Sequence, residues 1–382
     1  MFKTTNRHHL ALTAAAILLC PAVSLGQTAP TSDAAASHTG PLSGYMDFHF
    51  NKDEAQDGVV DFHRFVLLFN HSFSSRIRFV GELEIEHAFV EGLEESGEVE
   101  LEQAYIDFLI TRGFNLRAGM VLVPLGIINE RHEPPVYNGV ERPFVDTVII
   151  PTTWFDAGAG LHGELRHGFR YRAYVMAPLN SLEFTAAEGI RHGPQKGSRA
   201  NVRNVAFTGR LEYLGVRGLV LGAGGWRGKS TFALPRLDTT VSVGEVDARY
   251  RRKRLELRGQ FARVGISDAA NLNDAVGRLT GVSPNVAEGL QGFYGEAAYR
   301  IRDQGSPRDL VGFVRYENFD TQHRMPAGFL PLKEFDRDAW VFGVTYYPDP
   351  DVAVKVDYVR QRNQSPILKA PNSFNIGLGW WF

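Results

Sequence analysis

A glycine-rich stretch is the first candidate for chemistry in this chain. Residues 223–230 read A-G-G-W-R-G-K-S, a loose match to the loop that binds nucleotide phosphates through backbone amides and a lysine. That chemistry needs a helix that begins at the Lys-Ser pair, so that the helix N-terminus faces the phosphate. Phe232, Leu234 and Pro235 follow instead, and then a β-branched strand. We therefore interpret Lys229 as a loop cation and expect no nucleotide.

The histidines and serines supply no recognisable metal or catalytic motif. The sequence has neither H-E-x-x-H nor G-x-S-x-G. Glu130 and His132 form an E-x-H pair that can ligate a metal, but a hydrogen-bond network within the loop is the simpler explanation of both residues. Cys20 is the single cysteine and lies in the N-terminal leader, so thiolate metal sites are not expected. The sequence predicts no cofactor, no metal and no enzyme, although a Ser/His pair assembled across the fold leaves a lipid or peptide hydrolase as an alternative.

The N-terminus is predicted to direct export. Residues 1–26 have the form of a secretory signal peptide, with two cations before an apolar run and small residues at the cleavage point. Residues 27–40 are small and polar, as expected of a flexible periplasmic lead-in. The formal net charge of −2 argues against nucleic acid as a partner.

The last ten residues have a clear two-residue period. Alternate side chains of a strand point to opposite faces, and here asparagine and glycine occupy one face. The other face carries Phe374, Ile376, Leu378, Trp380 and Phe382. This segment resembles the closing strand of bacterial outer-membrane barrels, and the resemblance implies recognition by the barrel-assembly machinery.

The same alternation recurs throughout residues 41–382. It defines about sixteen segments of the ~10-residue length that a membrane-spanning strand needs. Short connections alternate with long ones, as expected when turns lie on one side of a membrane and loops on the other. A bilayer admits strands only as a closed barrel, because every backbone polar group must be paired. We therefore predict an all-β fold, a transmembrane antiparallel β-barrel of about 16 strands formed by residues 41–382 as one domain.

The third long connection, Ile127 to Trp154, is stiff, charged and unusually long. It contains four prolines and ends in the apolar tail Val148 to Ile150, which is expected to pack against the inside of the barrel wall. The loop should then narrow the lumen. Its predicted constriction residues are Arg131, His132, Glu133, Glu141, Arg142 and Asp146.

Several motifs resemble the phosphate-selective porin O and P family in its broad sense. They are A-Y-I-D-F at Ala104 to Phe108, N-L-R-A-G-M at Asn115 to Met120, and N-E-R-H-E-P-P and G-V-E-R-P in the third loop. The resemblance spans essentially the whole mature chain. It implies a water-filled, usually trimeric pore of sixteen strands, narrowed by the inward-folded third loop.

Charged side chains of inward parity are the predicted pore wall. Carboxylates are interleaved with the cations in nearly equal number, which weakens the expectation of phosphate or other anion selectivity. Each cation is either a solute-facing charge or the partner of a carboxylate on a neighbouring strand. The predicted wall cations are Arg78, Arg117, Arg172, Arg210, Arg249, Arg258, Arg300 and Arg315.

These observations favour a porin of the bacterial outer membrane, through which small hydrophilic solutes or ions diffuse passively. Phosphate and other anions are candidate solutes. The partners expected of it are outer-membrane lipid and lipopolysaccharide, the solutes themselves, and two further copies in a homotrimer. A barrel enzyme or a non-conducting surface platform built on the long loops are the alternatives.

Overall fold

A computed structural model describes residues 41–87, 97–230, 237–301 and 308–382. They all belong to one compact unit, which covers residues 33–382. The predicted signal peptide (1–26) and lead-in (27–40) lie outside the described residues.

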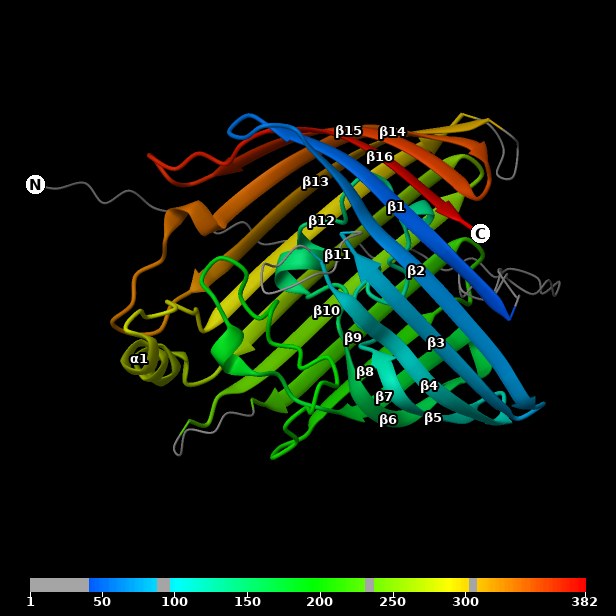
Figure 1. Ribbon diagram of the computed structural model, residues 1–382, viewed down its shortest axis with the longest axis horizontal. Coiled ribbons are helices and arrows are strands. Elements are labelled where there is room, and N and C mark those ends of the chain that lie inside the picture. Colours follow the sequence, from blue (N-terminus) through cyan, green and yellow to red (C-terminus); the bar gives the residue numbers. More distant parts are fainter. Residues whose placement is uncertain (1–40, 88–96, 231–236, 302–307) are drawn as a thin grey trace, which may run out of the picture. The chain divides into compact units, whose positions relative to one another are not determined.

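The described residues form sixteen antiparallel strands in a closed barrel, which confirms the predicted fold class. Each strand pairs with its neighbours in the chain, and β1 closes the ring by pairing with β16 (Figure 1). The strands are β1 (Leu42–Asp53), β2 (Val59–Ser74), β3 (Ile77–Glu86), β4 (Val99–Thr111), β5 (Phe114–Leu122), β6 (Phe155–Glu164), β7 (Phe169–Met176), β8 (Ala206–Tyr213), β9 (Leu219–Lys229), β10 (Thr240–Arg252), β11 (Leu255–Ile266), β12 (Gly289–Arg300), β13 (Asp309–Arg324), β14 (Asp336–Asp349), β15 (Val352–Asn363) and β16 (Ser373–Trp381).

The outer face of the barrel is mainly apolar, with exposed cations such as Arg227, Arg263 and Arg360 near its long-loop end, and most polar residues of the strands point inward. In β16, Phe374, Ile376 and Leu378 are 41%, 39% and 37% exposed, whereas Asn375 between them is 2% exposed. A soluble protein shows the opposite arrangement, because exposed apolar side chains gain nothing in water. The outer face therefore suits lipid.

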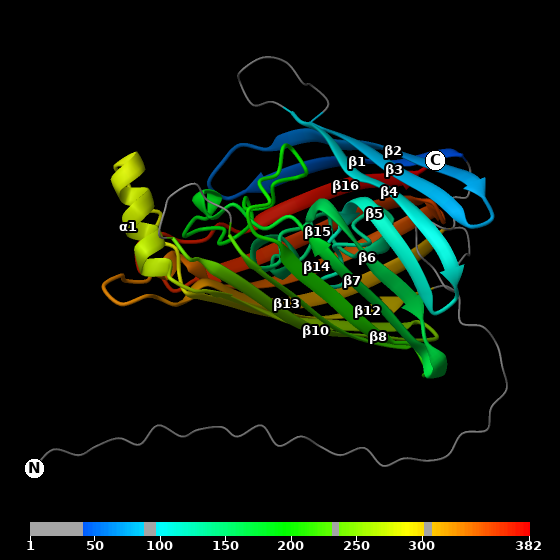
Figure 2. The same cartoon turned by 90° about the horizontal axis from the view of Figure 1, so that it is seen from below.

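The connections differ in length at the two ends of the barrel. Turns such as residues 75–76, 112–113 and 253–254 join strands at the short-turn end, which also holds the start of β1 and the end of β16. Long connections join strands at the other end, the long-loop end (Figure 2). The helical segments are η2 (Pro134–Val136), η3 (Val145–Ile149), η4 (Arg166–Gly168), η5 (Ser181–Glu183), α1 (Ala269–Thr280) and η6 (Lys333–Phe335).

Among the described residues, no helix is both long enough and apolar enough to cross a membrane.

Loop 3, residues 123–154 between β5 and β6, folds into the barrel as predicted. Its apolar tail is buried, with Ile149 and Ile150 fully enclosed. A Cβ on Gly292 of β12 would lie 3.0 Å from Ile149, so the missing side chain makes room for the tail. Loop 4 (residues 177–205), α1 and the wall complete an apolar core that extends from the inside of the barrel to α1 at the long-loop end, and it includes Leu125, Trp154, Phe184, Ile190, Trp226, Val264, Leu272 and Phe319.

Candidate functional site

Loop 3 is held against the wall by charged wall side chains that pair with its backbone. Lys355 Nζ donates to the carbonyls of Tyr137 (2.9 Å) and Gly139 (2.8 Å). The Val140 amide donates to Asp357 Oδ2 at 2.6 Å. An irregular loop in a protein interior has no ladder of its own, so these bonds satisfy backbone groups that would otherwise be unpaired. They fix loop 3 against β15.

Two inward glycines of β16 allow the loop to approach closely. A Cβ on Gly379 would lie 2.5 Å from Pro134 Cβ, and a Cβ on Gly377 would lie 3.1 Å from Val140. Any larger residue at Gly379 would therefore displace the loop. The glycines that alternate with the aromatic residues of the closing strand thus leave room for loop 3 inside the barrel.

The six predicted constriction residues divide by exposure. Arg131 and Glu141 are partly exposed, and the Glu141 carboxylate accepts a hydrogen bond from Asn51 Nδ2 at 2.8 Å. Arg142 is 9% exposed and donates to Thr153 Oγ1 (3.2 Å) and to the His132 carbonyl (3.3 Å). The remaining three, His132, Glu133 and Asp146, are 2%, 6% and 0% exposed.

His132 and Asp146 contact opposite parts of the wall. His132 Nε2 lies 3.2 Å from Glu102 Oε2 of β4. Burial by itself would lower the pKa of His132, but the Glu102 carboxylate outweighs burial and holds that pKa well above its ordinary value. Asp146 accepts a hydrogen bond from Gln260 of β11 at 2.7 Å, and burial raises the pKa of Asp146 to about 7. Both residues therefore attach loop 3 to the wall.

A half-open cavity of about 290 Å³ lies between loop 3 and the wall at the long-loop end. Its lining includes Asn51, Glu141, Arg142, Arg315, Asp357 and Asn375. Arg315 also donates to the Asn138 carbonyl at 3.1 Å, and Asp357 binds the Val140 amide. The residues that anchor loop 3 thus form part of this cavity.

All eight predicted wall arginines point into the barrel, and each forms an ion pair with a carboxylate. Two side chains are covered, since Arg210 and Arg315 are 1% and 3% exposed. The other six keep side-chain exposures of 12% to 43%, and each lies within four residues of the strand end at the short-turn end. They are Arg78, Arg117, Arg172, Arg249, Arg258 and Arg300.

Glu212 of β8 collects four guanidinium groups. Its carboxylate lies 2.6 Å from Arg170, 2.9 Å from Arg172, 3.3 Å from Arg210 and 2.7 Å from Arg249. Arg170 is absent from the predicted set, although it has the same inward parity as Arg172 in β7. Three further carboxylates balance these cations, because Arg210 pairs with Glu245 and Asp247, Arg249 with Asp247, and Arg172 with Glu130 of loop 3.

Glu130 of loop 3 forms an ion pair with a wall arginine and does not contact His132. Its carboxylate lies 2.9 Å from Arg172 on β7. His132 contacts Glu102 on β4 instead. The E-x-H pair therefore does not converge on one site.

Carboxylates dominate the wall at the long-loop end of β2–β4. Asp61, Glu86 and Glu98 keep side-chain exposures of 24%, 30% and 60%, and Glu100 keeps 16%. Lys196 of loop 4 pairs with Glu98 at 3.3 Å and also with Glu100. On this side of the described barrel the charged lining thus changes from mainly acidic near the long-loop end to basic near the short-turn end, where Arg78 and Arg117 lie.

The closed barrel, its apolar outer belt and its inward loop define a porin-like sixteen-stranded barrel. Among solved structures, OmpF of Salmonella typhi in complex with daunomycin is similar, with 14% identity, a TM-score of 0.61, and coverage of 89% of this chain and 97% of that chain. An anion-selective porin from Comamonas acidovorans has 12% identity and a TM-score of 0.56, with coverage of 89% and 98%. At these identities the likeness concerns the fold.

A protein of Aquifex aeolicus described as uncharacterized is 34% identical over 355 residues, which cover 89% of this chain and 79% of that protein. The chain belongs to the same family as this protein. No protein-family model matches the chain. The resemblance to the phosphate-selective porin O and P family therefore stays a prediction.

Proposed function

We propose that this barrel is an outer-membrane porin through which small hydrophilic solutes and ions diffuse passively, without enzymatic turnover. The apolar outer belt would face lipid and lipopolysaccharide, and the closing strand would be the segment that the barrel-assembly machinery reads. The family resemblance supports a homotrimer.

Six partly solvated arginines near the short-turn end carry this proposal. Charged side chains buried only to hold a protein together would be expected to be covered, as Arg210 and Arg315 are. Arg78, Arg117 and Arg249 instead keep side-chain exposures of 43%, 17% and 20% inside the barrel. Water that reaches them from the short-turn end forms the hydrated part of the proposed pore.

Selectivity should depend on the solvated charges rather than on the total charge. The solvated charges of this half are mainly cationic, and Arg131 of loop 3 extends the set. Paired carboxylates such as Glu212 offset part of this potential. We therefore propose a modest preference for anions, with phosphate as one candidate solute.

The test is single-channel conductance of the refolded chain in a planar bilayer, with reversal potentials measured in a KCl gradient and then with phosphate added. Stepwise conductance is expected. Its reversal potential should indicate a preference for anions, and that potential should shift towards zero in Arg131→Ala. Arg112→Ala is the matched control, because Arg112 is 84% exposed in a turn and should leave the reversal potential unchanged.

Conductance with no ion preference, or with a preference for cations, would support the porin function but contradict the proposed preference for anions. Absence of conductance from a correctly folded barrel would overturn the diffusion pore. Assays of lipid hydrolysis and of surface binding would then separate the barrel enzyme from the surface platform.

A further inference from the structure

A buried group of potential metal ligands lies where loop 3 meets β3 and β4. Glu82 of β3, Glu102 of β4 and His132 of loop 3 each offer one donor atom, and these atoms lie within 4.8 Å of one another. Each of the three residues is 2% exposed. Two carboxylates and an imidazole are a common ligand set for divalent transition metals.

A β-bulge turns Glu102 toward this group. Glu82 pairs with Gln103 and Leu83 pairs with Leu101, so Glu102 is the extra residue in β4. Regular alternation would put Glu102 on the outer face with Ala104, yet it is buried inside. Bulges often redirect a side chain at a functional site.

His132 is held with Nε2 directed at the carboxylates. Its Nδ1 lies 3.1 Å from the Asn129 carbonyl, which can only accept a hydrogen bond. Asn129 is itself fixed, because its side chain binds the Val123 carbonyl at 2.7 Å and the Trp154 amide at 2.6 Å. In the metal-free chain Nε2 carries a proton that faces Glu102. A metal ion would replace that proton and take the Nε2 lone pair while Nδ1–H stays on the carbonyl, which is the usual arrangement of metal-ligating histidines.

The two donor separations from His132 match those around a metal ion. His132 Nε2 lies 3.2 Å from Glu102 Oε2 and 3.5 Å from Glu82 Oε1. Bonds of about 2.1 Å in a tetrahedral site separate the donors by about 3.4 Å. A cation therefore fits among these atoms with little rearrangement. Tyr45 Oη donates to Glu82 Oε1 at 3.2 Å and supports the carboxylate from outside.

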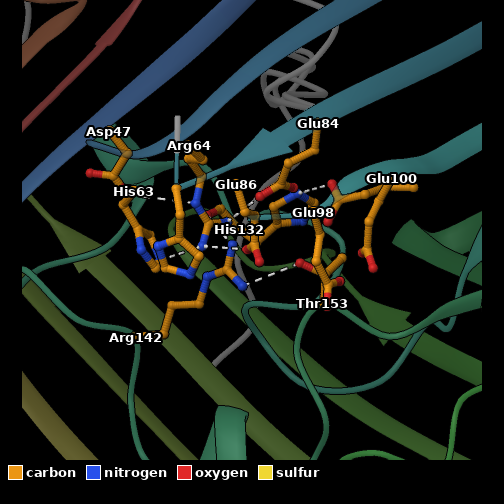
Figure 3. A network of polar contacts seen from close by, with 12 residues as sticks. Asp47, His63, Arg64, Glu84, Glu86, Glu98, Glu100, His132, Arg142 and Thr153 are labelled. Carbon is orange, nitrogen blue, oxygen red and sulfur yellow. Dashed lines mark hydrogen bonds and ion pairs between the residues drawn. The ribbon is translucent and has the colours of Figure 1, made fainter. Parts of the chain in front are cut away.

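Glu84 supplies an independent sign that a cation belongs here. It is 1% exposed, and neither of its carboxylate oxygens makes a hydrogen bond. Arg64 Nη1 lies 3.6 Å from Glu84 Oε1, beyond hydrogen-bonding distance. Arg64 thus forms an ion pair with Glu84 but no hydrogen bond, and a nearby metal ion would further offset the cost of burying this carboxylate. In Figure 3 the side chains of Arg64, Glu84 and His132 converge on the same region.

We propose that Glu82, Glu102 and His132 bind one divalent transition-metal cation, such as Zn²⁺ or Mn²⁺, next to the buried Glu84 carboxylate. The ion links loop 3 to β3 and β4, and so fixes the loop that narrows the lumen. This site is independent of whether the barrel conducts ions.

A second histidine cluster at the long-loop mouth serves as the control. Asp61, His63 and His87 also hold three donor atoms within 4.8 Å of one another. However, Arg64 Nη2 lies 2.8 Å from His63 Nε2 and needs that nitrogen as an acceptor. A metal on His63 Nδ1 would put the ring proton on Nε2, against the arginine. We therefore assign the metal to the buried group.

The experiment refolds the mature chain in detergent with Zn²⁺ or with Mn²⁺ in separate reactions, removes free metal with a chelator, and measures bound metal by elemental mass spectrometry. About one ion per folded chain is expected with at least one of the two metals, together with a higher unfolding temperature than for chain refolded without metal. Glu102→Gln and His132→Gln should each lose the ion and the rise in unfolding temperature. His87→Gln should keep both.

Circular dichroism and heat-modifiable electrophoretic mobility report whether each variant has folded. If Glu102→Gln does not fold, His132→Gln and the electron paramagnetic resonance of Mn²⁺ in the unaltered chain carry the test. Folded wild-type chain that retains neither metal would overturn the proposal. So would metal that survives in Glu102→Gln and His132→Gln but disappears in His87→Gln, because the ion would then belong to the mouth.

Discussion

At the scale of single residues, burial rather than charge decides what the charged side chains of loop 3 do. Asp146 and Arg131 were predicted to share one role, yet Asp146 is fully buried and Arg131 is partly exposed. The Asp146 Oδ2 atom makes no hydrogen bond, while Oδ1 accepts from Gln260 at 2.7 Å. A carboxylate in these surroundings favours its neutral form.

The titration of Asp146 makes stability fall as pH rises. Burial raises the pKa of this carboxyl from 3.8 to about 7, so the folded chain keeps a proton that the unfolded chain releases. The resulting stabilisation is complete below about pH 4 and is lost as pH rises through about 7. Asp146→Asn should therefore be more stable than wild type at pH 8, by about 2 to 4 kcal/mol, and nearly equal to it at pH 4.

Urea unfolding in detergent micelles at pH 4, 6 and 8 measures this difference. Asp238→Asn is the control, because Asp238 is 74% exposed and should change little at any of these pH values. If the free energies of unfolding of wild type and Asp146→Asn change in parallel with pH, Asp146 ionises normally in the folded barrel and the prediction is wrong.

At the scale of elements, loop 3 and the closing strand are fitted to each other. The loop lies against β16 because Gly377 and Gly379 leave no side chains on the inner face, and charged groups of β15 and β13 bind the loop backbone. The strand thus meets two separate requirements, apolar residues on its outer face and glycine at the two inner positions that loop 3 approaches most closely. The position of the loop follows from both.

Adding one methyl group to β16 should therefore move loop 3. The Cβ of Gly379→Ala would lie 2.5 Å from Pro134 Cβ, so the loop must shift, at about 1 to 3 kcal/mol of stability. Gly295→Ala in β12 is the matched control, since nothing lies within 4 Å of a Cβ there. Urea unfolding compares their stabilities, and channel recordings compare their conductances. Equal behaviour of the two variants would mean that loop 3 does not rest on Gly379.

The strands and their faces could be predicted from sequence, because a two-residue period is a local property. The inward folding of loop 3 was also predictable, since the apolar tail at Ile149 and Ile150 had to be buried. Its contacts were not, because they depend on residues more than a hundred positions away, such as Gln260 and Asp357. Glu102 was missed for a different reason: a bulge reverses its face, and the regular pattern of β4 gives no sign of a bulge.

At the scale of the whole barrel, the charged lining changes sign along the axis. On β2–β4, Asp61, Glu86 and Glu98 are partly exposed at the long-loop end, whereas the partly solvated wall arginines, including Arg117 and Arg249, lie near the short-turn end. The acidic mouth should concentrate cations, and the basic half should concentrate anions. This arrangement rests on position and exposure, so the formal net charge of −2 does not reveal it.

If the barrel conducts, a lining of this kind should rectify the current. When the long-loop side is positive, cations enter from the acidic mouth and anions from the basic half, so each enters where it is already concentrated. The opposite voltage draws both ions from the ends that repel them, and the current should be smaller. Recordings at equal voltages of both signs, with the barrel inserted in one orientation, measure the ratio. Glu86→Gln combined with Glu98→Gln should bring that ratio closer to one, and high salt should do the same by screening the charges. A symmetric current at low salt would mean that ions meet one uniform lining, and the division of charge between the two mouths would then have no part in permeation.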